Sequence, residues 1–376
     1  MVPLATPVLP TILVVFGATG DLMRRKLVPA LYHLHARQLL PPLFRVVGFS
    51  RREWTDAQFR DLVASARPKI ALLSEPTRRQ FLELFTFHSG LLDQADSYHQ
   101  LAARLGAQDR AWKTCANKLF HLAVPPELYD TILKHLAPSG LTSACSPEEG
   151  FARVLVEKPF GHDLKTAQEL DALLAKLFKE EQIYRIDHYL GKETVRNVLA
   201  FRFSNAFFEP AWNQEMIERI TIRLLESSGI GDRGAYYDGA GALRDVGQNH
   251  LLQLLSLFTM DNPGTFTAEA IRRKRQEVLS ALCLMSPAEV ASHTIRGQYH
   301  GYRQEPNVAA GSITETYFKI KAHLNLPRWQ NVPIYLESGK MMGEDKAGVS
   351  ITFRHLRPCL CPPGRHYRNV LRYNIQ

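Results

Sequence analysis

The densest cluster of polar side chains in the sequence is the segment RIDHYLGKE, residues 185–193. In a helix, His188 and Lys192 would share one face because they lie four positions apart. Two cationic donors on one face can hold a phosphate dianion, and Asp187 would point elsewhere and be available for another task. A solvated helix surface explains the same residues, so the segment alone leaves both interpretations open.

A glycine turn near the N-terminus is typical of dinucleotide binding. The segment GATGDL directly follows the apolar run TILVVF and opens a helical pattern. Glycines allow a tight turn and close approach to the backbone, and the helix N-terminus offers free N–H groups to a pyrophosphate. The third glycine of the usual fingerprint is absent, and a turn without a ligand is the alternative. The predicted cofactor-binding residues of this turn are Gly17, Thr19, Gly20, Asp21 and Leu22.

The second apolar run, RVVGF, ends in Ser50-Arg51-Arg52. NAD-binding proteins usually place a carboxylate here to bind the ribose 2′-hydroxyl, whereas a guanidinium suits a 2′-phosphate. Arg51 therefore favours NADP over NAD. A solvated basic loop, with Glu53 nearby, is the alternative.

The composition and net charge limit the classes of protein to which this chain could belong. The net charge is +9, but the basic residues are dispersed, which favours phosphorylated small molecules over nucleic acid as partners. The apolar runs are too short to cross a membrane. The five cysteines are odd in number and scattered, which argues against a disulfide framework and indicates a cytoplasmic location.

Hydrophobic patterning predicts two domains. In the first half apolar runs alternate with helical patterns, which indicates βαβ units and a doubly wound, Rossmann-like parallel sheet. In the second half ERITIRLLE and TETYFKIKAHL alternate with period two, as half-buried antiparallel strands do. We expect an α/β domain over residues 1–185 and an α+β domain with a large, mainly antiparallel sheet over residues 186–376.

Four blocks carry a resemblance to a known family. GATGDL with RRKL, EKPFG, RIDHYLGKE and DGAGALRDVGQNHLLQLL occur in this order, and at these separations the chain resembles the glucose-6-phosphate dehydrogenases from its first strand to CLCPPG. RIDHYLGKE is highly specific to that family, whereas GATGDL is not. The resemblance implies NADP-dependent oxidation of glucose 6-phosphate to the 6-phosphogluconolactone, without a metal, by a homodimer or higher homo-oligomer.

The resemblance also implies a role for each matched residue. His250 matches the general base that takes the proton of the anomeric hydroxyl, a task suited to an imidazole. Asp187 matches the carboxylate that orients this base and stabilises its imidazolium form. Without the resemblance, a buried or capping role explains His250.

Further matches imply the contacts to substrate and cofactor. His188, Tyr189 and Lys192 match phosphate-binding residues, while Glu226 and Asp245 match carboxylates that bind sugar hydroxyls. The other matches are Lys158, which is positioned by Pro159 between cofactor and substrate, Lys340 in the substrate pocket, and the cofactor contacts Thr19, Arg51 and Tyr129. A surface acid at a strand end is the alternative for Glu226, and a solvated turn is the alternative for Lys158.

Two features depart from the family's pattern. The family usually places a second basic residue about five positions after Lys340, where this chain has Asp345 followed by Lys346. Family members commonly continue beyond residue 376, so we expect the sheet of the second domain to be incomplete. Apart from these departures, the sequence contains zinc-type ligands whose spacing fits no common zinc site, namely His355, Cys359, Cys361 and His366.

The sequence therefore predicts a glucose-6-phosphate dehydrogenase with its substrate between the two domains, at the carboxyl ends of the parallel strands. One alternative is a different enzyme, another two-domain NAD(P)-dependent sugar oxidoreductase. A second is a non-catalytic member of the family that binds NADP or sugar phosphate. A basic nucleic-acid-binding protein is the third, and the dispersed charge argues against it.

Overall fold

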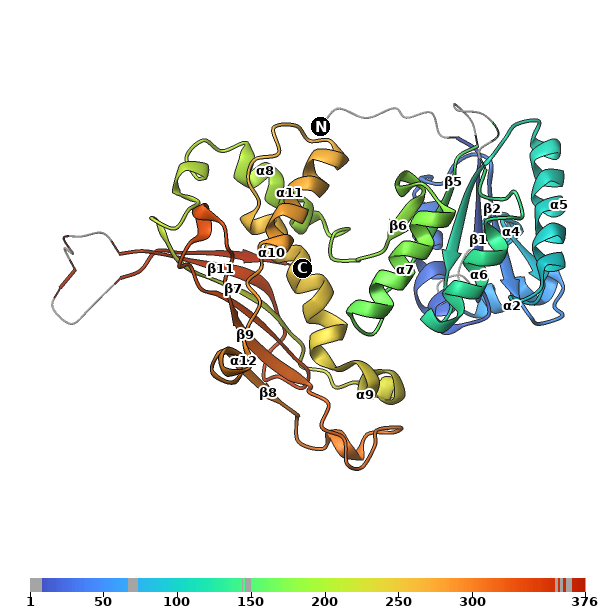
Figure 1. Ribbon diagram of the computed structural model, residues 1–376. Coiled ribbons are helices and arrows are strands. Elements are labelled where there is room, and N and C mark those ends of the chain that lie inside the picture. The colour runs from blue at the N-terminus through green and yellow to red at the C-terminus, as the bar shows by residue number, and fades with distance from the viewer. Residues whose placement is uncertain are drawn as a thin grey trace. The chain divides into compact units, whose positions relative to one another are not determined.

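The computed structural model describes residues 9–66, 74–143, 145, 150–355, 358, 361–362 and 367–375 (Figure 1). The chain divides into two compact units, Met1–Ile186 and Asp187–Gln376. This division lies one residue from the boundary expected at 185/186. Within the described residues, no helix combines the length and the apolar character that a membrane span requires.

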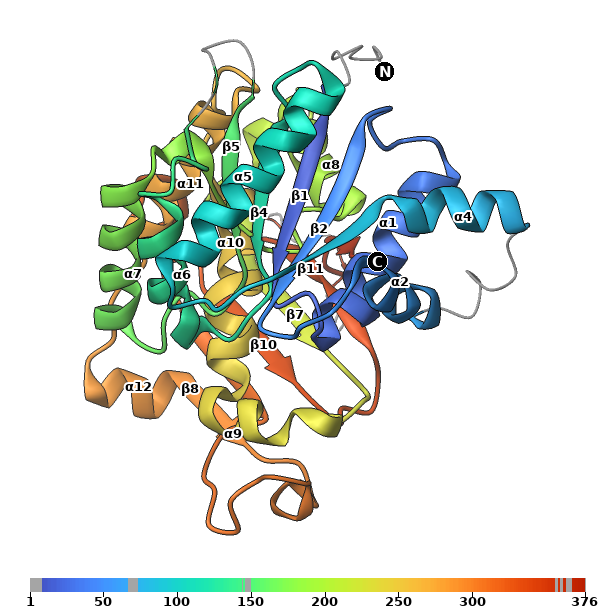
Figure 2. The ribbon, with the colours of Figure 1, turned by 90° about the vertical axis from the view of Figure 1, so that its right-hand side faces the viewer.

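The first unit is a six-stranded parallel sheet with the strand order β3-β2-β1-β4-β5-β6. Helices pack against both faces, because the apolar side chains of alternate sheet positions form two separate cores. One core includes Leu101 of α5 and Ile132 of α6, and the other includes Val28 of α1 and Phe59 of α2 (Figure 2). The elements are β1 (Thr11–Phe16), η1 (Met23–Leu27), α1 (Val28–Ala36), β2 (Phe44–Ser50), α2 (Asp56–Ser65), α4 (Glu75–Glu83), β3 (Phe85–Ser89), α5 (Ala95–Trp112), β4 (Asn117–Leu122), η2 (Pro126–Leu128), α6 (Tyr129–Leu136), β5 (Ala152–Val156), α7 (Leu164–Leu177), η3 (Glu180–Gln182) and β6 (Ile183–Arg185).

The second unit is a mixed six-stranded sheet with the order β12-β11-β7-β10-β9-β8. All neighbouring strands are antiparallel except β7 and β10, which are parallel. Its core packs the sheet against α8, α10 and α11. The elements are α8 (Glu193–Phe203), η4 (Glu209–Ala211), β7 (Ile217–Leu225), η5 (Gly231–Arg233), α9 (Gly234–Ala242), η6 (Leu243–Leu251), α10 (Leu252–Thr259), α11 (Ala268–Ser280), α12 (Pro287–His293), β8 (Thr294–Gly297), η7 (Tyr302–Gln304), β9 (Tyr317–Ala322), η8 (Pro327–Trp329), β10 (Ile334–Gly339), β11 (Lys346–Phe353) and β12 (Val370–Asn374).

The predicted fold class is confirmed: a doubly wound parallel sheet is followed by a mainly antiparallel one. The helix expected after the glycine turn is divided, because η1 is a π-helix and α1 continues it as an α-helix. Cys115 and Cys145, 30 positions apart in sequence, lie side by side with their Cα atoms 6.4 Å apart.

Candidate active site

His250 and Asp187 form a buried pair in the second unit. His250 lies near the end of the π-helix η6, and its Nδ1 is 2.7 Å from Oδ1 of Asp187. The two side chains are 3% and 5% exposed. Nδ1 faces the carboxylate, so Nε2 is the ring nitrogen on the side away from Asp187. The pair therefore has the geometry of a base oriented by an acid.

The charge of Asp187 is stabilised locally. Burial by itself would raise the pKa of Asp187, but hydrogen bonds from His250 and from the Tyr189 amide lower it below its usual value. The second oxygen, Oδ2, is buried without a hydrogen-bond partner among the described residues. Arg275 of α11, whose guanidinium donates to Ser256, adds a favourable electrostatic interaction with Asp187. Asp187 is thus held as a carboxylate at neutral pH.

The residues after Asp187 form a turn rather than a helix. Gly191 N donates to His188 O and Lys192 N donates to Tyr189 O, and Lys192 directly precedes α8. The condition for a shared helical face of His188 and Lys192, that the segment is helical, is therefore not met. The turn still gathers these residues, because the His188 ring and the Lys192 ammonium lie 4.8 Å and 4.7 Å from the Tyr189 ring.

Two aromatic rings lie against that of His250. The centroids of the His188 and Tyr189 rings are each 4.5 Å from that of His250. Burial raises the pKa of Tyr189 to about 12, so its hydroxyl stays neutral at ordinary pH. The turn thus places two polar rings and one ammonium beside the Asp187–His250 pair.

Glu226 and Lys340 meet because their strands are parallel. Glu226 directly follows β7, Lys340 directly follows β10, and Leu225 pairs with Gly339 in the register of the two strands. The carboxyl ends of neighbouring parallel strands lie at one edge of a sheet. The buried Lys340 ammonium donates to the half-exposed Glu226 carboxylate.

Asp245 lies in the first turn of η6 and is 4% exposed. Its carboxylate accepts a hydrogen bond from the Tyr236 hydroxyl at 3.3 Å and lies 3.9 Å from the Arg233 guanidinium. Tyr236 and Arg233 were not singled out from the sequence, since nothing in their spacing indicates that the chain returns past Asp245. Asp245 and His250 both belong to η6, so this helix positions both side chains.

Asp345 has a defined contact in place of the basic residue expected there. Its two carboxylate oxygens accept hydrogen bonds from the backbone N–H and the hydroxyl of Ser227, at 2.7 Å and 2.8 Å. These bonds lower the pKa of Asp345. Lys346 donates to Glu344 on the exposed side of the same loop. Asp345 thus holds the backbone directly after Glu226.

In the first unit, the glycine turn lies where the sheet topology reverses. Gly17 follows β1, whose two neighbours are β2 and β4, and crevices at such points bind dinucleotides in doubly wound folds. Gly17 has a φ of +79°, and a Cβ there would lie 2.4 Å from Ala123 O, after β4. Thr19 lies beside the end of β2, with its hydroxyl 3.3 Å from that of Ser50.

The other predicted cofactor residues lie around this turn or beside it. Gly20, Asp21 and the exposed Arg51 lie on the surface, and Leu22 directly precedes η1. Tyr129, by contrast, is 2% exposed, and its hydroxyl donates to Glu157 O at 3.1 Å. His121 Nε2 lies 3.0 Å from the Glu157 carboxylate. Tyr129 and His121 thus hold Glu157, the residue before Lys158. A cis peptide bond joins Lys158 to Pro159.

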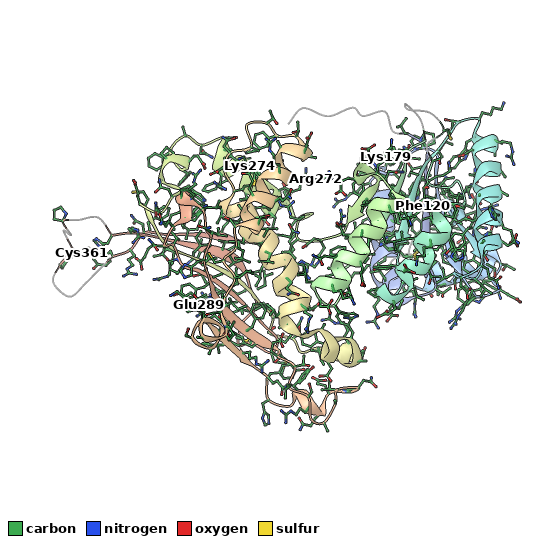
Figure 3. All side chains as sticks on the ribbon, in the orientation of Figure 1. Phe120, Lys179, Arg272, Lys274, Glu289 and Cys361 are labelled. Atoms are coloured by element: carbon green, nitrogen blue, oxygen red, sulfur yellow. A yellow bond between two sulfur atoms is a disulfide. The ribbon has the colours of Figure 1, made fainter. Side chains whose placement is uncertain are left out.

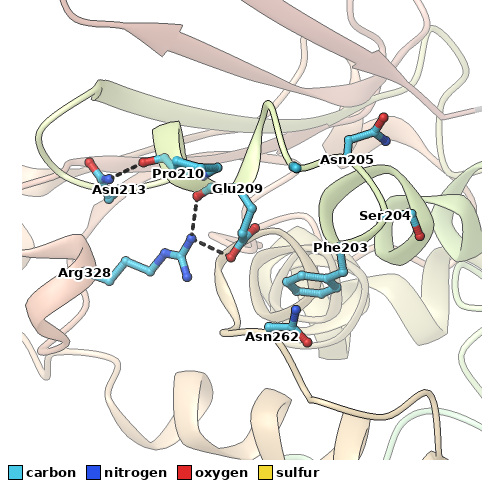
Figure 4. Close-up of a pocket in the computed structure, with 9 residues that line it drawn as sticks. Phe203, Ser204, Asn205, Glu209, Pro210, Asn213, Asn262 and Arg328 are labelled. Carbon is cyan, nitrogen blue, oxygen red and sulfur yellow. Dashed lines mark hydrogen bonds and ion pairs between the residues drawn. The ribbon is translucent and has the colours of Figure 1, made fainter.

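A cavity of about 770 Å³ in the second unit lies outside this set of residues (Figure 4). Its charged residues bind each other, because Arg328 donates to the carboxylate and the carbonyl of Glu209 and to Asp261. None of the predicted site residues lines it. The lining residues are Phe203, Ser204, Asn205, Ala206, Glu209, Pro210, Asn213, Asn262 and Arg328.

Only part of the cysteine–histidine set near the C-terminus lies within the described residues. His355 Nε2 lies 3.2 Å from the Cys361 sulfur, while Cys359 and His366 lie outside the described residues.

A doubly wound unit with a dinucleotide-type turn, followed by an α+β unit that holds a buried histidine–aspartate pair, defines a two-domain nicotinamide-dependent oxidoreductase. Two family models cover the chain: "Glucose-6-phosphate dehydrogenase, NAD binding domain" matches residues 14–197, and "Glucose-6-phosphate dehydrogenase, C-terminal domain" matches residues 199–376. The chain belongs to the glucose-6-phosphate dehydrogenase family.

Individual relatives agree with this assignment. The chain is 41% identical over 356 residues to glucose-6-phosphate 1-dehydrogenase 2 of Mycobacterium bovis, covering 91% of this chain and 68% of the relative. It is 38% identical over 355 residues to glucose-6-phosphate 1-dehydrogenase of Bacillus subtilis, covering 92% and 71%. A solved glucose-6-phosphate dehydrogenase in complex with glucose 6-phosphate superposes with a TM-score of 0.86 at 34% identity, covering 97% of this chain and 75% of that one.

Proposed function

We propose that this chain oxidises D-glucose 6-phosphate to 6-phospho-D-glucono-1,5-lactone with NADP, the first step of the oxidative pentose phosphate pathway. The observation that carries the proposal is the buried hydrogen bond between His250 and Asp187, next to His188, Tyr189 and Lys192. Family membership supports the same reaction.

The first unit has residues that fit the cofactor. Gly17 leaves no room for a side chain at the turn after β1, so a pyrophosphate could approach the backbone of residues 17–22. Arg51, exposed at the end of β2, would hold the 2′-phosphate, and Lys158 is a further candidate contact of the cofactor. When bound, NADP supplies a nicotinamide ring that accepts the hydride.

The second unit would bind the sugar phosphate. His188, Tyr189 and Lys192 are donors gathered in one turn, and a phosphate dianion is the ligand that such donors favour. Glu226 and Asp245 offer carboxylate oxygens to sugar hydroxyls. Lys340, by donating to Glu226, holds that carboxylate in place.

His250 would take the proton of the anomeric hydroxyl on Nε2. The hydrogen bond from Nδ1 to Asp187 fixes the tautomer that leaves Nε2 as the acceptor, and the carboxylate then stabilises the imidazolium ion. Loss of this proton from oxygen, together with loss of the C1 hydrogen as a hydride to the cofactor, would turn the C1–O bond into the carbonyl of the lactone.

The test is a turnover assay of the purified 376-residue chain with glucose 6-phosphate and NADP. We expect NADPH to form, and to form far more slowly with unphosphorylated glucose, since the donors of the 188–192 turn would lack their ligand. A folded chain that produces no NADPH contradicts the proposal. NADP binding without turnover, unchanged in His250→Ala, would instead support a non-catalytic role.

We also propose a homodimer or higher homo-oligomer and a cytoplasmic location, which family membership supports. Light scattering of the purified chain tests the first. Fractionation of cells that express it tests the second.

A further inference from the structure

The helix that contains His250 is capped at its N-terminus by the carboxylate of a distant residue, Glu315. Oε1 of Glu315 accepts a hydrogen bond from the N–H of Leu243, the first residue of η6, at 3.0 Å. The backbone carbonyl of Glu315 accepts the N–H of Ala242 at 2.9 Å. The first N–H groups of a helix have no partners within it, and Glu315 satisfies two of them from a segment 72 positions away.

Gly241 makes this approach possible. It has a φ of +73°, inside the region that favours glycine, and it makes a kink in the last turn of α9, just before η6 begins. A Cβ at this position would lie 2.5 Å from Oε1 of Glu315 and 2.8 Å from its carboxyl carbon. The carboxylate therefore packs directly on the backbone of residue 241, and any side chain there would displace it.

The next residue along, Thr316, holds the other side of the candidate site. Its carbonyl accepts the N–H of Lys340 at 2.9 Å, and its hydroxyl accepts the N–H of Tyr299 at 2.8 Å. Thr316 is completely buried and directly precedes β9. Two consecutive residues thus fasten the start of the η6 helix and the backbone of Lys340.

We propose that Glu315 is a positioning residue that sets the spacing between the η6 groups, Asp245 and His250, and the Lys340–Glu226 pair. This inference rests on the proposed function, because it assigns both groups to one substrate. A carboxylate is well suited to the task, since negative charge at a helix N-terminus is favoured by the helix dipole. The substrate would then meet its acceptors and its base at a fixed distance.

The test compares Glu315→Ala with Glu315→Gln in the full chain. The amide of glutamine keeps an oxygen acceptor for Leu243 N–H, whereas alanine removes it. For Glu315→Ala we expect kcat/KM for glucose 6-phosphate to fall about tenfold, with a higher KM and a lower kcat. The KM for NADP should stay unchanged, because the cofactor turn lies in the first unit. Glu315→Gln should recover activity to within about threefold of the unaltered chain.

Glu289 supplies the matched control (Figure 3). It also accepts hydrogen bonds at a helix start, from the backbone N–H and hydroxyl of Ser286 at α12. Glu289→Ala should lower stability without changing either KM. A purely structural role for Glu315 predicts that both alanine variants lose stability while kcat/KM per folded molecule is unchanged, and that result overturns the inference.

Two further outcomes separate this inference from the proposed function. No turnover by the unaltered chain contradicts the proposed function itself. If Glu315→Ala does not fold, the comparison moves to Glu315→Asp, whose shorter side chain keeps the charge but cannot span the same gap. Unchanged kinetics in Glu315→Asp would then contradict the inference.

Discussion

Nδ1 of His250 lies 2.7 Å from Oδ1 of Asp187, across 63 positions of sequence. Both side chains are almost completely buried, so a charge on either of them depends on the other. An ion pair that loses one partner in such a place leaves an uncompensated buried charge. The two residues therefore have to be understood as one unit, in catalysis and in stability.

Replacing His250 with alanine should remove the base while leaving cofactor binding intact. A positioned general base contributes about 10²- to 10⁴-fold to a rate, and we expect kcat to fall by a factor in that range. NADP binding, measured by fluorescence titration, should be unchanged. A His250→Ala variant that keeps full turnover would exclude this residue as the base.

Asp187→Asn should make stability less dependent on pH. The pKa of Asp187 is lower in the folded chain than its ordinary value of 3.8. The ionised carboxylate therefore contributes stability above the unfolded value, and this contribution is lost as the pH falls through the folded value. Urea midpoints of both proteins, measured between about pH 3 and pH 7, should differ most at the upper end and converge at the lower end. A constant difference across the range would contradict the assignment.

The sequence predicts best what depends on local pattern. TILVVF, RVVGF and ARVLVEK are buried runs beside turn residues, and all three form strands of the parallel sheet. The direction of β10 relative to β7 has no local signal, because period-two alternation is the same in parallel and antiparallel pairs. That direction decides that Glu226 and Lys340 meet.

Side-chain partners that come from distant segments were not predictable. The resemblance named His250 and Asp187, but the residues themselves gave no reason to pair them across so many positions. The spacing of His188 and Lys192 could not show whether the segment is helical, and the hydrogen bonds after Asp187 form a turn instead. Glu315 had no signal at all, since in the sequence a carboxylate that caps a helix from a distant loop resembles any surface acid.

Chelation should not affect turnover. Asp187, His188 and His250 offer ligand atoms within 4.8 Å of one another, a grouping that a metal ion could also use. However, Nδ1 of His250 is already bonded to Asp187, and proton transfer to Nε2 needs no metal. We expect equal kcat before and after dialysis against EDTA. Loss of activity that zinc or magnesium restores would show that the three residues are ligands.

Arg51→Ala should weaken NADP use without affecting NAD. The guanidinium at the end of β2 would pair with the 2′-phosphate, and losing a charge-assisted pair of this kind costs about 10- to 100-fold in binding. We expect the KM for NADP to rise by a factor in that range, while the KM for NAD stays the same. Arg52→Ala is the matched control, because the Arg52 guanidinium lies 5.0 Å from the centre of the Trp54 ring and should not contribute to the preference. If both cofactors weaken equally in Arg51→Ala, or if Arg52→Ala has the larger effect, then the 2′-phosphate is not bound by Arg51 and the cofactor preference has another origin.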